Sequence, residues 1–456
     1  MARLPLEGVR IIDMSQVISG PYACGLMADL GAEVIKIEGP GRVDNSRETA
    51  GIVSGMYADN QLGVDPWNRN SYYNVLNRGK KSLVLDLNKA EGLQALKDLI
   101  KVSDVLMENF TPRVTRRWGL EYPDIRKIKP DFVMVSNTGY GRGDGPYSEY
   151  PGQATSMEAT HGLAHVTGYR DDLPSKAGRA YVDFLATWAC MIGVALGLRH
   201  RHRTGKGLWV DMGMYQLGCF GVSEYVLDWE ANQRIGKRIG NRHPWQAPQG
   251  CYACSGADQW CVISVRDDKD WTALCGLMGK AELASDARFA TNRARMTQHD
   301  EIDAIIAAWT RNLTKFEVME RVQGVGVPAG AAFDAKDMNL DPHYRSRGFL
   351  EMMQFPPERK MGKRVVLGRP WRLSKTPIGI RGPSPALGQH NREVLQGILG
   401  YTDARYAELE QAGIIGIRPT KRQSVSHLPM EEYVKLGLLA DYDPDFKQRL
   451  GIQDPE

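Results

Sequence analysis

Short apolar runs alternate with amphipathic stretches along the first 140 residues. The apolar runs, rich in β-branched residues, predict strands at 9–14, 33–37, 82–87, 102–107 and 132–135. Between them, helical patterns end at Leu30, just before Gly31, and cover 91–100. Strands separated by single helices are typical of an α/β fold with a Rossmann-like, doubly wound parallel sheet.

The pattern changes after residue 225. Residues 260–265 alternate as a strand, and helical patterns follow at 271–278 and 301–311. We therefore expect a large Rossmann-like domain over 1–225, a smaller α+β domain over 226–328, and a return to the large domain over 329–456. The last section contains a short strand at 364–367, a helix at 392–399 and a charged tail. Residues 39–77 form a long polar excursion, which in a compact domain is usually functional or mobile.

Composition indicates a soluble globular protein of the cytoplasm. Of 456 residues, 42% are hydrophobic and 25% charged, and the net charge of +4 is too small to suggest nucleic acid as a partner. We expect no membrane span, because the longest apolar stretch, 184–198, is shorter than the ~20 residues required and suits a buried helix. Cys251, Cys254 and Cys261 lack a fourth ligand at a suitable spacing, so we expect reduced cysteines and no metal.

The first strand–helix turn argues against a nicotinamide dinucleotide site. Residues 19–25 (SGPYACG) lack the G-x-G-x-x-G spacing that lets the backbone approach a pyrophosphate. Glu38 stands where a ribose-binding acid would be, but without the glycines it carries little weight. A ligand is still expected beyond the carboxyl ends of the strands, in the loops after Met14, Ile37 and Met107.

Several stretches, in the same order, give the chain a resemblance to a known family. They are LEGVRIIDMSQVISGPYACGLMADLGAEVIKIE, KKSLVLDL, SDVLMENFTPRV, SNTGYGRGDGPYSEYPG, AYVDFLATWACMIGVALGLRHRHRTGKGLWVDM, RIGNRHPWQAP, VGVPAGAAFDAKDMNLDPHYRSRG and ALGQHNREVLQGILGY. Together they resemble the family III CoA-transferases, which include formyl-CoA transferase, carnitine CoA-transferase and alpha-methylacyl-CoA racemase. The resemblance covers residue 5 to about residue 415. It implies CoA and acyl-CoA as substrates, no permanently bound cofactor, and an interlocked dimer.

The resemblance implies that Asp183 is the nucleophile. In the family, an aspartate precedes a long apolar helix that ends in R-x-R-T-G-x-G, and Asp183 stands at that position. A carboxylate can carry the acyl group as an anhydride and then CoA as a thioester, provided that water is kept out. From the neighbouring residues alone, we expect Asp183 to be the N-cap of the helix instead, and one residue can fill both roles. Members often have a glycine a few residues after the aspartate, where this chain has Ala186-Thr187-Trp188. Trp188 either shapes the acyl pocket or packs in the core.

The CoA contacts are also implied by the resemblance. Arg117 matches an arginine that contacts the nucleotide phosphates, Arg42 and Arg47 are candidates for the 3′-phosphate, and Lys89 stands beside Asn88, where some members carry a lysine. The expected CoA-binding set is Ile18, Ser19, Arg42, Leu85, Asp86, Leu87, Asn88, Lys89, Asn109, Phe110, Thr111 and Arg117.

Two loops and the segment 242–250 are expected to form the acyl pocket. In relatives, the G-Y-G loop and the following Y-P-G-Q loop approach the pantetheine, and 242–250 replaces the glycine run of formyl-CoA transferase. The expected pocket residues are Tyr140, Tyr150, Gly152, Gln153, Trp188, Trp245 and Gln246. The aromatic residues among them are equally compatible with ordinary core packing.

Two alternative functions follow from the same resemblance. One is a racemase, which needs the histidine of an A-G-H-D stretch as a general base. This chain has Gly152-Gln153-Ala154 at that position, and His161 and His165 come too late in the sequence, which argues against a racemase. The other alternative is a non-catalytic partner subunit, as in the benzylsuccinate enzymes, so the assembly is expected to be a homodimer or a heteromer. Aromatic residues between Tyr215 and Tyr252 favour an aromatic or arylalkyl-succinate acceptor, and hence aromatic acid metabolism, with succinyl-CoA as donor.

Overall fold

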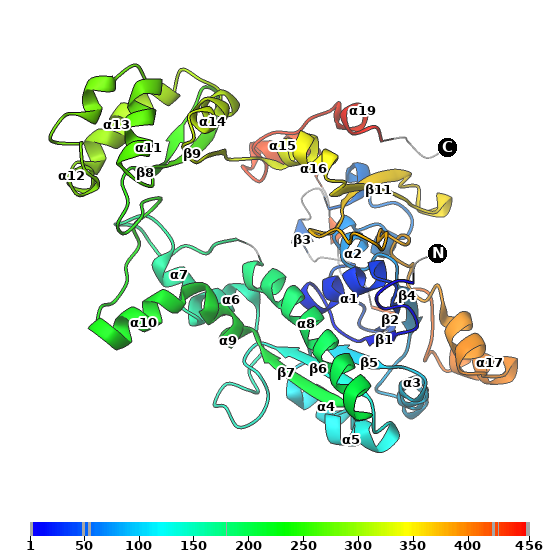
Figure 1. Ribbon diagram of the computed structural model, residues 1–456. Coiled ribbons are helices and arrows are strands. Elements are labelled where there is room, and N and C mark those ends of the chain that lie inside the picture. The colour runs from blue at the N-terminus through cyan, green and yellow to red at the C-terminus, as the bar shows by residue number, and fades with distance from the viewer. Residues whose placement is uncertain are drawn as a thin grey trace. The chain divides into compact units, whose positions relative to one another are not determined.

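A six-stranded parallel sheet organises the larger part of the chain (Figure 1). Its strands are β1 (Arg10–Asp13), β2 (Glu33–Glu38), β4 (Lys81–Val84), β5 (Val105–Glu108), β6 (Val133–Thr138) and β7 (Leu208–Gly213). They lie in the order β4-β2-β1-β5-β6-β7, and every neighbouring pair is parallel. The doubly wound α/β fold and the five N-terminal strands predicted from the apolar runs are therefore confirmed, with ends shifted by a few residues.

The computed structural model describes residues 3–47, 51–52, 56–178, 180–421, 425–426 and 428–452. The chain forms two compact units. The first unit comprises residues 1–161, 178–222 and 340–456, and the second comprises 162–177 and 223–339. The predicted domain limits at 225 and 328 stay predictions. The grouping of 162–177 with the second unit was not expected, because this polar segment carries no periodic signal. Part of the predicted excursion at 39–77 lies outside the described residues.

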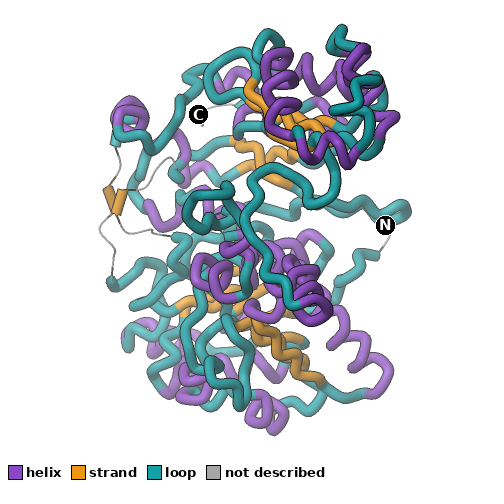
Figure 2. Tube along the Cα trace, turned by 90° about the vertical axis from the view of Figure 1, so that its left-hand side faces the viewer, coloured by secondary structure: helices purple, strands orange, loops and turns teal. Residues whose placement is uncertain are grey.

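Alternate residues of each strand face two separate cores. Ile11 packs with Met27, Val34 and Val194 under helices α1 (Ser19–Asp29) and α8 (Tyr181–Thr204). Its neighbour Ile12 joins the opposite core, which is covered by α3 (Ala90–Lys101), α5 (Tyr122–Ile128), η6 (Glu393–Ile398) and α17 (Asp403–Gln411). Figure 2 shows helices on both sides of the strands. Because both faces are covered, the strands consist of nearly continuous apolar runs.

Helix α8 belongs to the connection between the last two strands of the sheet, β6 and β7. Its close approach to β6 depends on Gly197, where an added Cβ would lie 2.4 Å from Val133 Cγ1. The helix ends at Gly205, which has φ +67° and no Cβ to oppose that conformation. Among the described residues, α8 alone is long and apolar enough to cross a membrane. This apolar helix is therefore longer than the stretch 184–198 expected from the sequence. One face of α8 nevertheless packs on the sheet.

Shorter elements complete the first unit. Strands β11 (Leu350–Gln354) and β12 (Lys363–Leu367) form an antiparallel hairpin, and β3 (Gly51–Ile52) pairs in parallel with β13 (Val425–Ser426). The predicted helix at 392–399 is a π-helix, η6. The remaining helices of this unit are α2 (Ser71–Leu76), α4 (Pro112–Arg117), α6 (Ala154–Thr160), α9 (Met214–Cys219), α16 (Pro342–Ser346), α18 (Met430–Lys435) and α19 (Phe446–Leu450).

The second unit has its own sheet and core. Strands β8 (Gln249–Ala253), β9 (Trp260–Ser264) and β10 (Ala329–Ala331) form an antiparallel sheet in the order β10-β9-β8. Its buried core contains Trp271, Phe289, Ile302 and Val318. The predicted strand at 260–265 and the helices at 271–278 and 301–311 are confirmed as β9, α11 (Asp268–Leu277) and α13 (His299–Thr310). The other helices are α7 (Leu163–Val166), α10 (Ser223–Asn232), α12 (Asn292–Thr297), α14 (Lys315–Gly324) and α15 (Ala335–Leu340).

Candidate active site

Buried charges support the loop that follows β1. Lys80 Nζ donates to the carboxylate of Asp13 at 2.7 Å, and Lys36 Nζ donates to Asp44 at 2.8 Å. Burial opposes ionisation of Asp13, but Lys36 and Lys80 outweigh it and hold the pKa of Asp13 below its ordinary value. Asp44 also accepts the backbone N–H of Val17 at 3.1 Å, and Val17 has φ +70°, which is unusual for a β-branched residue. The buried pairs thus fix the loop that leads into α1.

Ser19, at the start of α1, connects this loop to the helix that carries Asp183. Asn137 Nδ2 at the end of β6 donates to Ser19 Oγ at 2.6 Å. The Thr187 hydroxyl lies 3.0 Å from the carbonyl oxygen of Asp183 and 3.3 Å from that of Ser19, so it can donate to either. The Thr187 hydroxyl thus lies between the backbone carbonyls of Ser19 and Asp183, and the CoA contact expected of Ser19 stays a prediction. Asn137 and Thr187 were not predicted, since polar residues at a strand end and inside a helix give no specific signal.

Asp183 lies in the first turn of α8 and is partly buried. The N-cap of this helix is Ala180, so the alternative role of Asp183 as the cap is wrong. Burial raises the pKa of Asp183 to about 6, and the carboxylate of Glu158 adds to the shift. The positive end of the helix dipole favours the anion. At neutral pH the group is therefore mostly ionised, but it is more basic than an exposed aspartate.

Helix α6 contributes two buried polar residues that sequence reasoning did not select. Glu158 is fully buried, and its charge acts on Asp183. His161, at the C-terminal end of α6, packs against Gly218, where an added Cβ would lie 2.1 Å from the imidazole ring. Burial lowers the pKa of His161, which favours the neutral imidazole, and neither ring nitrogen hydrogen-bonds to a described residue. The sequence gives no local signal that the Glu158 carboxylate acts on Asp183, because an acidic residue inside a short helix is common.

Apolar side chains surround the base of the Asp183 turn. Met157, Val182, Ala186 and Met214 are buried together in one cluster. Such a wall limits the access of water to reactive acyl groups.

The two predicted tyrosine loops meet in one aromatic cluster. The ring centroid of Tyr140 lies 5.5 Å from that of Tyr147, 6.4 Å from Tyr150 and 5.7 Å from Tyr215. The loops touch at Gly139 and Gly152, where an added Cβ on Gly152 would lie 2.5 Å from Gly139 Cα. Gly152 thus holds the loops together by lacking a side chain. Its contact with substrate stays a prediction.

Gln153 is the N-cap of α6. Its backbone N–H donates to Ser156 Oγ at 3.2 Å, and the two residues form a capping box. The side chain therefore has a structural role here, and the substrate contact predicted for it is untested.

Trp188 packs edge-on against Trp371, with ring centroids 5.3 Å apart. Both residues belong to the first unit, so Trp188 is part of an aromatic pair. Trp245 and Gln246 belong to the second unit. There Trp245 is 65% exposed and packs edge-on against His243 at 5.1 Å. The substrate contacts predicted for Trp188, Trp245 and Gln246 are untested.

The loop after β4 meets the end of α4, and the CoA contacts expected of the residues there stay predictions. Arg117 Nη2 donates to Asn88 Oδ1 at 3.2 Å, so these two predicted CoA residues are neighbours. The Lys89 ammonium donates to the carbonyl of Ala412 at 2.5 Å. Leu85 and Leu87 are buried in the sheet core, and the backbone N–H of Asp86 donates to Ile414 O at 2.9 Å. Leu85, Asp86 and Leu87 can therefore shape the loop, whereas Asn88 and Arg117 offer polar side chains.

Two arginines after β2 have opposite surroundings. Arg47 is fully buried and forms an ion pair with Glu38 at 2.7 Å, which is supported by Asn68 and the Trp67 carbonyl. The suggestion that Arg47 reaches a 3′-phosphate is therefore wrong, because its guanidinium is already committed to structural partners. Arg42 is exposed, and its contact with a phosphate stays a prediction.

The loop after β5 is joined to the loop after β1. The Gln16 N–H donates to Asn109 Oδ1 at 2.8 Å, and Asn109 Nδ2 donates to the Gln16 carbonyl at 2.9 Å. Phe110 packs edge-on against Trp118 at 5.5 Å, and Thr111 is the N-cap of α4. Ile18, in the loop after β1, is buried in a separate cluster with Leu76 and Ala180. These residues lie at the carboxyl ends of adjacent strands, where a ligand of a doubly wound sheet binds.

The cysteines are all free, including Cys251, Cys254 and Cys261. Within the described part of the chain, no group of three or more histidine, cysteine or acidic residues is placed to hold a metal ion.

Residues 6–391 match the model of CoA-transferase family III. The chain belongs to this family. It is 35% identical over 418 residues to a succinyl-CoA–D-citramalate CoA-transferase of Chloroflexus aurantiacus, covering 90% of this chain and 98% of the relative. It is 32% identical over 417 residues to the beta subunit of a succinyl-CoA–L-malate CoA-transferase of the same organism, with the same coverage.

A solved structure supports the fold assignment. A CaiB/BaiF family protein from Brucella suis superposes with a TM-score of 0.76 at 28% identity, covering 87% of this chain and all of the other. The protein is thus an enzyme of the CoA-transferase type.

Proposed function

We propose that the protein moves CoA from an acyl-CoA donor to a carboxylic acid acceptor, with Asp183 as the covalent carrier. The observation that carries the proposal is the state of Asp183. It lies in the first turn of α8, is partly buried beside an apolar wall, and has a pKa raised to about 6. Such a carboxylate is ionised at neutral pH and more nucleophilic than an exposed one.

The first half of the reaction loads the enzyme with CoA. A carboxylate oxygen of Asp183 attacks the thioester carbonyl of the donor, the C–S bond breaks, and CoA leaves as the thiolate. The product is a mixed anhydride between Asp183 and the donor acid. The thiolate then attacks the Asp183 carbonyl carbon, which releases the donor acid as a carboxylate and leaves CoA on Asp183 as a thioester.

The second half reverses these steps with the acceptor. The acceptor carboxylate attacks the Asp183 thioester and expels the CoA thiolate, which gives a second mixed anhydride. The thiolate attacks the acceptor carbonyl of this anhydride. The new acyl-CoA forms, and the carboxylate of Asp183 is regenerated. No proton or electron is gained or lost over the cycle.

We infer succinyl-CoA as the donor and a substituted succinate as the acceptor. Two relatives are named for succinyl-CoA, and both of their named acceptors, citramalate and malate, are dicarboxylic acids. The tyrosine cluster around Tyr140 and the Trp188–Trp371 pair supply aromatic surface in the first unit. These features support an acceptor with an aryl or alkyl substituent.

Mass spectrometry tests the carrier directly. The protein is incubated with succinyl-CoA, denatured in acid and digested, and we expect the peptide that contains Asp183 to gain the mass of CoA less one water. Asp183→Asn should abolish both this adduct and transfer to the acceptor. Asp124→Asn, a half-buried carboxylate of α5 that pairs with Lys127, should change neither. Full transfer by Asp183→Asn would overturn the mechanism.

A non-catalytic subunit is the second candidate, because one relative is the beta subunit of a heteromeric transferase. The same experiment separates the two candidates. An adduct on the purified chain alone supports an active subunit. Absence of the adduct, with activity restored by a second related chain, supports the partner-subunit role.

A further inference from the structure

Arg142 lies in the loop after β6, residues 139–152, and is held through both its backbone and its side chain. Its backbone N–H donates to Asp211 Oδ2 of β7 at 2.8 Å. Its guanidinium donates from Nη2 to Glu108 Oε1, at the end of β5, at 2.7 Å and from Nη1 to Thr115 Oγ1 of α4 at 2.8 Å. All of these residues belong to the first unit. One side chain thus joins the loop 139–152 to strand β5 and helix α4.

The ion pair between Arg142 and Glu108 lies almost completely out of water. The Arg142 side chain is 5% exposed and the Glu108 side chain 0%. Burial raises the pKa of the Glu108 carboxyl, although Arg142 and hydrogen bonds from Ser136 and the Phe110 backbone act in the opposite direction. Taking two charges out of water costs free energy that their attraction only partly returns. The pair therefore contributes little net stability, whereas the planar guanidinium fixes the geometry of the segments that it joins.

The loop held by Arg142 contributes to the apolar wall beside Asp183. Tyr140, two residues before Arg142, packs against the buried cluster that contains Val182 and Ala186. These two residues flank Asp183 in the first turns of α8. Exclusion of water by this wall protects reactive acyl groups, so the position of Tyr140 matters for the chemistry of the carrier.

We propose that Arg142 is a positioning residue, which holds Tyr140 against this wall and so keeps water from the thioester that Asp183 carries. The inference rests on the proposed function, because only a carrier thioester needs this protection. When the wall is open, water adds to the Asp183 carbonyl carbon and the C–S bond breaks. The products are CoA as the free thiol, the Asp183 carboxylate and one proton, so the donor is consumed without transfer.

The ratio of thioester hydrolysis to transfer tests this role. The protein is incubated with succinyl-CoA and labelled succinate. Transfer is measured as label that enters succinyl-CoA, and hydrolysis as the release of free CoA thiol. We expect Arg142→Gln to raise the ratio of hydrolysis to transfer about tenfold or more. Arg142→Lys keeps the charge but loses the fork that reaches two partners, so it should give an intermediate ratio.

A double variant separates positioning from the stability of the fold. Arg142→Gln alone leaves the Glu108 carboxylate buried without its partner, so the melting temperature should fall. Glu108→Gln combined with Arg142→Gln removes both charges, and much of the lost melting temperature should return. The ratio should stay as high as in Arg142→Gln, because the guanidinium is still missing. A ratio that returned to the wild-type value together with the melting temperature would overturn the inference.

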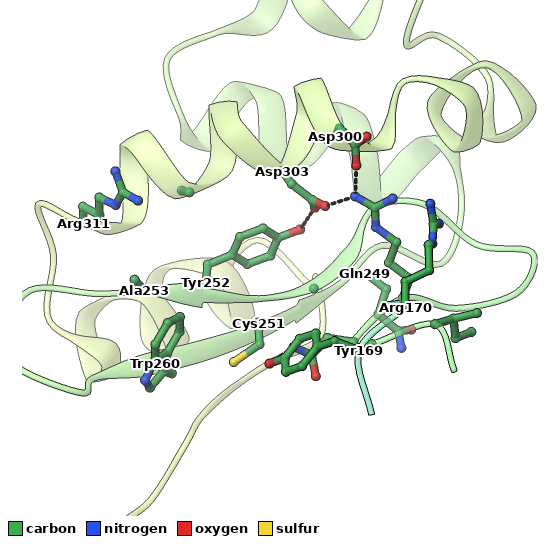
Figure 3. Close-up of a pocket in the computed structure, with 16 residues that line it drawn as sticks. Tyr169, Arg170, Gln249, Cys251, Tyr252, Ala253, Trp260, Asp300, Asp303 and Arg311 are labelled. Carbon is green, nitrogen blue, oxygen red and sulfur yellow. Dashed lines mark hydrogen bonds and ion pairs between the residues drawn. The ribbon is translucent and has the colours of Figure 1, made fainter. Parts of the chain in front are cut away.

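Asp303→Asn is the matched control, because Asp303 is another carboxylate held by an arginine. In the lining of a pocket of the second unit, Arg242 donates to Asp303 at 2.7 Å and the Tyr252 hydroxyl donates to it at 2.9 Å (Figure 3). Asp303 lies on α13, outside the segments expected to meet the substrates. The substitution should lower the melting temperature but leave the ratio unchanged. An equal rise in the ratio would contradict the role assigned to Arg142.

The outcomes separate this inference from the proposed function. Wild-type protein that forms the CoA adduct on Asp183, with an unchanged ratio in both Arg142 variants, would overturn the inference alone. Wild-type protein that forms no adduct and exchanges no succinate would overturn the mechanism, and the inference with it.

Discussion

The hydroxyl of Thr187 lies 3.3 Å from the carbonyl oxygen of Ser19 and so connects helix α8 to the start of helix α1. The same hydroxyl is 3.0 Å from the carbonyl of Asp183, one turn earlier in its own helix. A single buried side chain therefore helps to position both the proposed carrier and the loop expected to approach CoA.

Thr187→Val keeps the shape of this side chain and removes the hydroxyl. We expect transfer to fall about tenfold or more, since a small misplacement of a reacting group is costly. The free energy of unfolding should fall by only about 1 kcal/mol, the usual net value of one hydrogen bond. Steady-state kinetics and urea unfolding measure the two effects.

Thr204→Val is the matched control for that substitution. The Thr204 hydroxyl donates to His200 O at 2.8 Å, which is the same backbone contact at the exposed end of the same helix. It should change activity little. Equal losses in the two variants would show that Thr187 acts only through helix stability.

The rate of transfer should depend on the ionisation of Asp183. Because attack needs the carboxylate and burial raises its pKa to about 6, kcat/KM should fall as the pH drops below 6. Glu158→Gln removes a like charge while preserving the shape of the side chain. The acid limb of the profile should then move to lower pH. An unchanged midpoint would contradict the electrostatic coupling of Glu158 to Asp183.

The same shift has a consequence for stability. The folded-state pKa of Asp183, about 6, lies above the ordinary value of an aspartate, 3.8, so ionisation of this group disfavours the folded state. Its destabilising effect is absent below about pH 4 and grows as the pH rises toward 6. Asp183→Asn should therefore become more stable than the wild type over this interval, as followed by thermal unfolding at a series of pH values.

Arg47 and Arg42 give opposite expectations for stability. Arg47→Ala leaves the buried Glu38 carboxylate without its guanidinium, which should destabilise the fold by about 3–5 kcal/mol. Arg42→Ala removes an exposed side chain and should leave the melting temperature nearly unchanged. A melting temperature preserved in Arg47→Ala would contradict the structural role of this pair.

Substitution of Arg117 tests the CoA site directly. Arg117→Gln should raise the KM for the acyl-CoA about tenfold, as expected for losing one charge-assisted contact. The kcat should change little, because the reacting carbon is not touched. Arg126→Gln, on α5, provides the matched surface control. Dephospho-CoA thioesters then show whether the lost contact involves the 3′-phosphate.

The sequence predicts the sheet well because its strands are buried on both faces. Their apolar runs are nearly continuous, and residues such as Gly31 mark where the helices between them end. Contacts between distant segments could not be predicted this way. Nothing local distinguishes Arg42 from Arg47, since only the folded chain places Glu38, Asn68 and Tyr73 around one of them.

The candidate site was predictable where a family motif marks it and hidden elsewhere. Asp183 follows from its position before an apolar helix and a basic turn. Glu158 and Thr187 carry no comparable signal, because their roles depend on helices that meet only after folding.

Residues at both ends of the chain share one core of the large sheet. Leu96 and Leu99 pack in the same cluster as Tyr406, Leu409 and Ile414. During synthesis this core therefore stays incomplete until more than 400 residues have left the ribosome. The buried core residues of the second unit all lie between 252 and 327, so this core is complete well before the C-terminal residues are synthesised. We expect it to become protease-resistant on stalled nascent chains while the sheet around Asp183 is still open, and chaperone dependence should be concentrated in the larger unit.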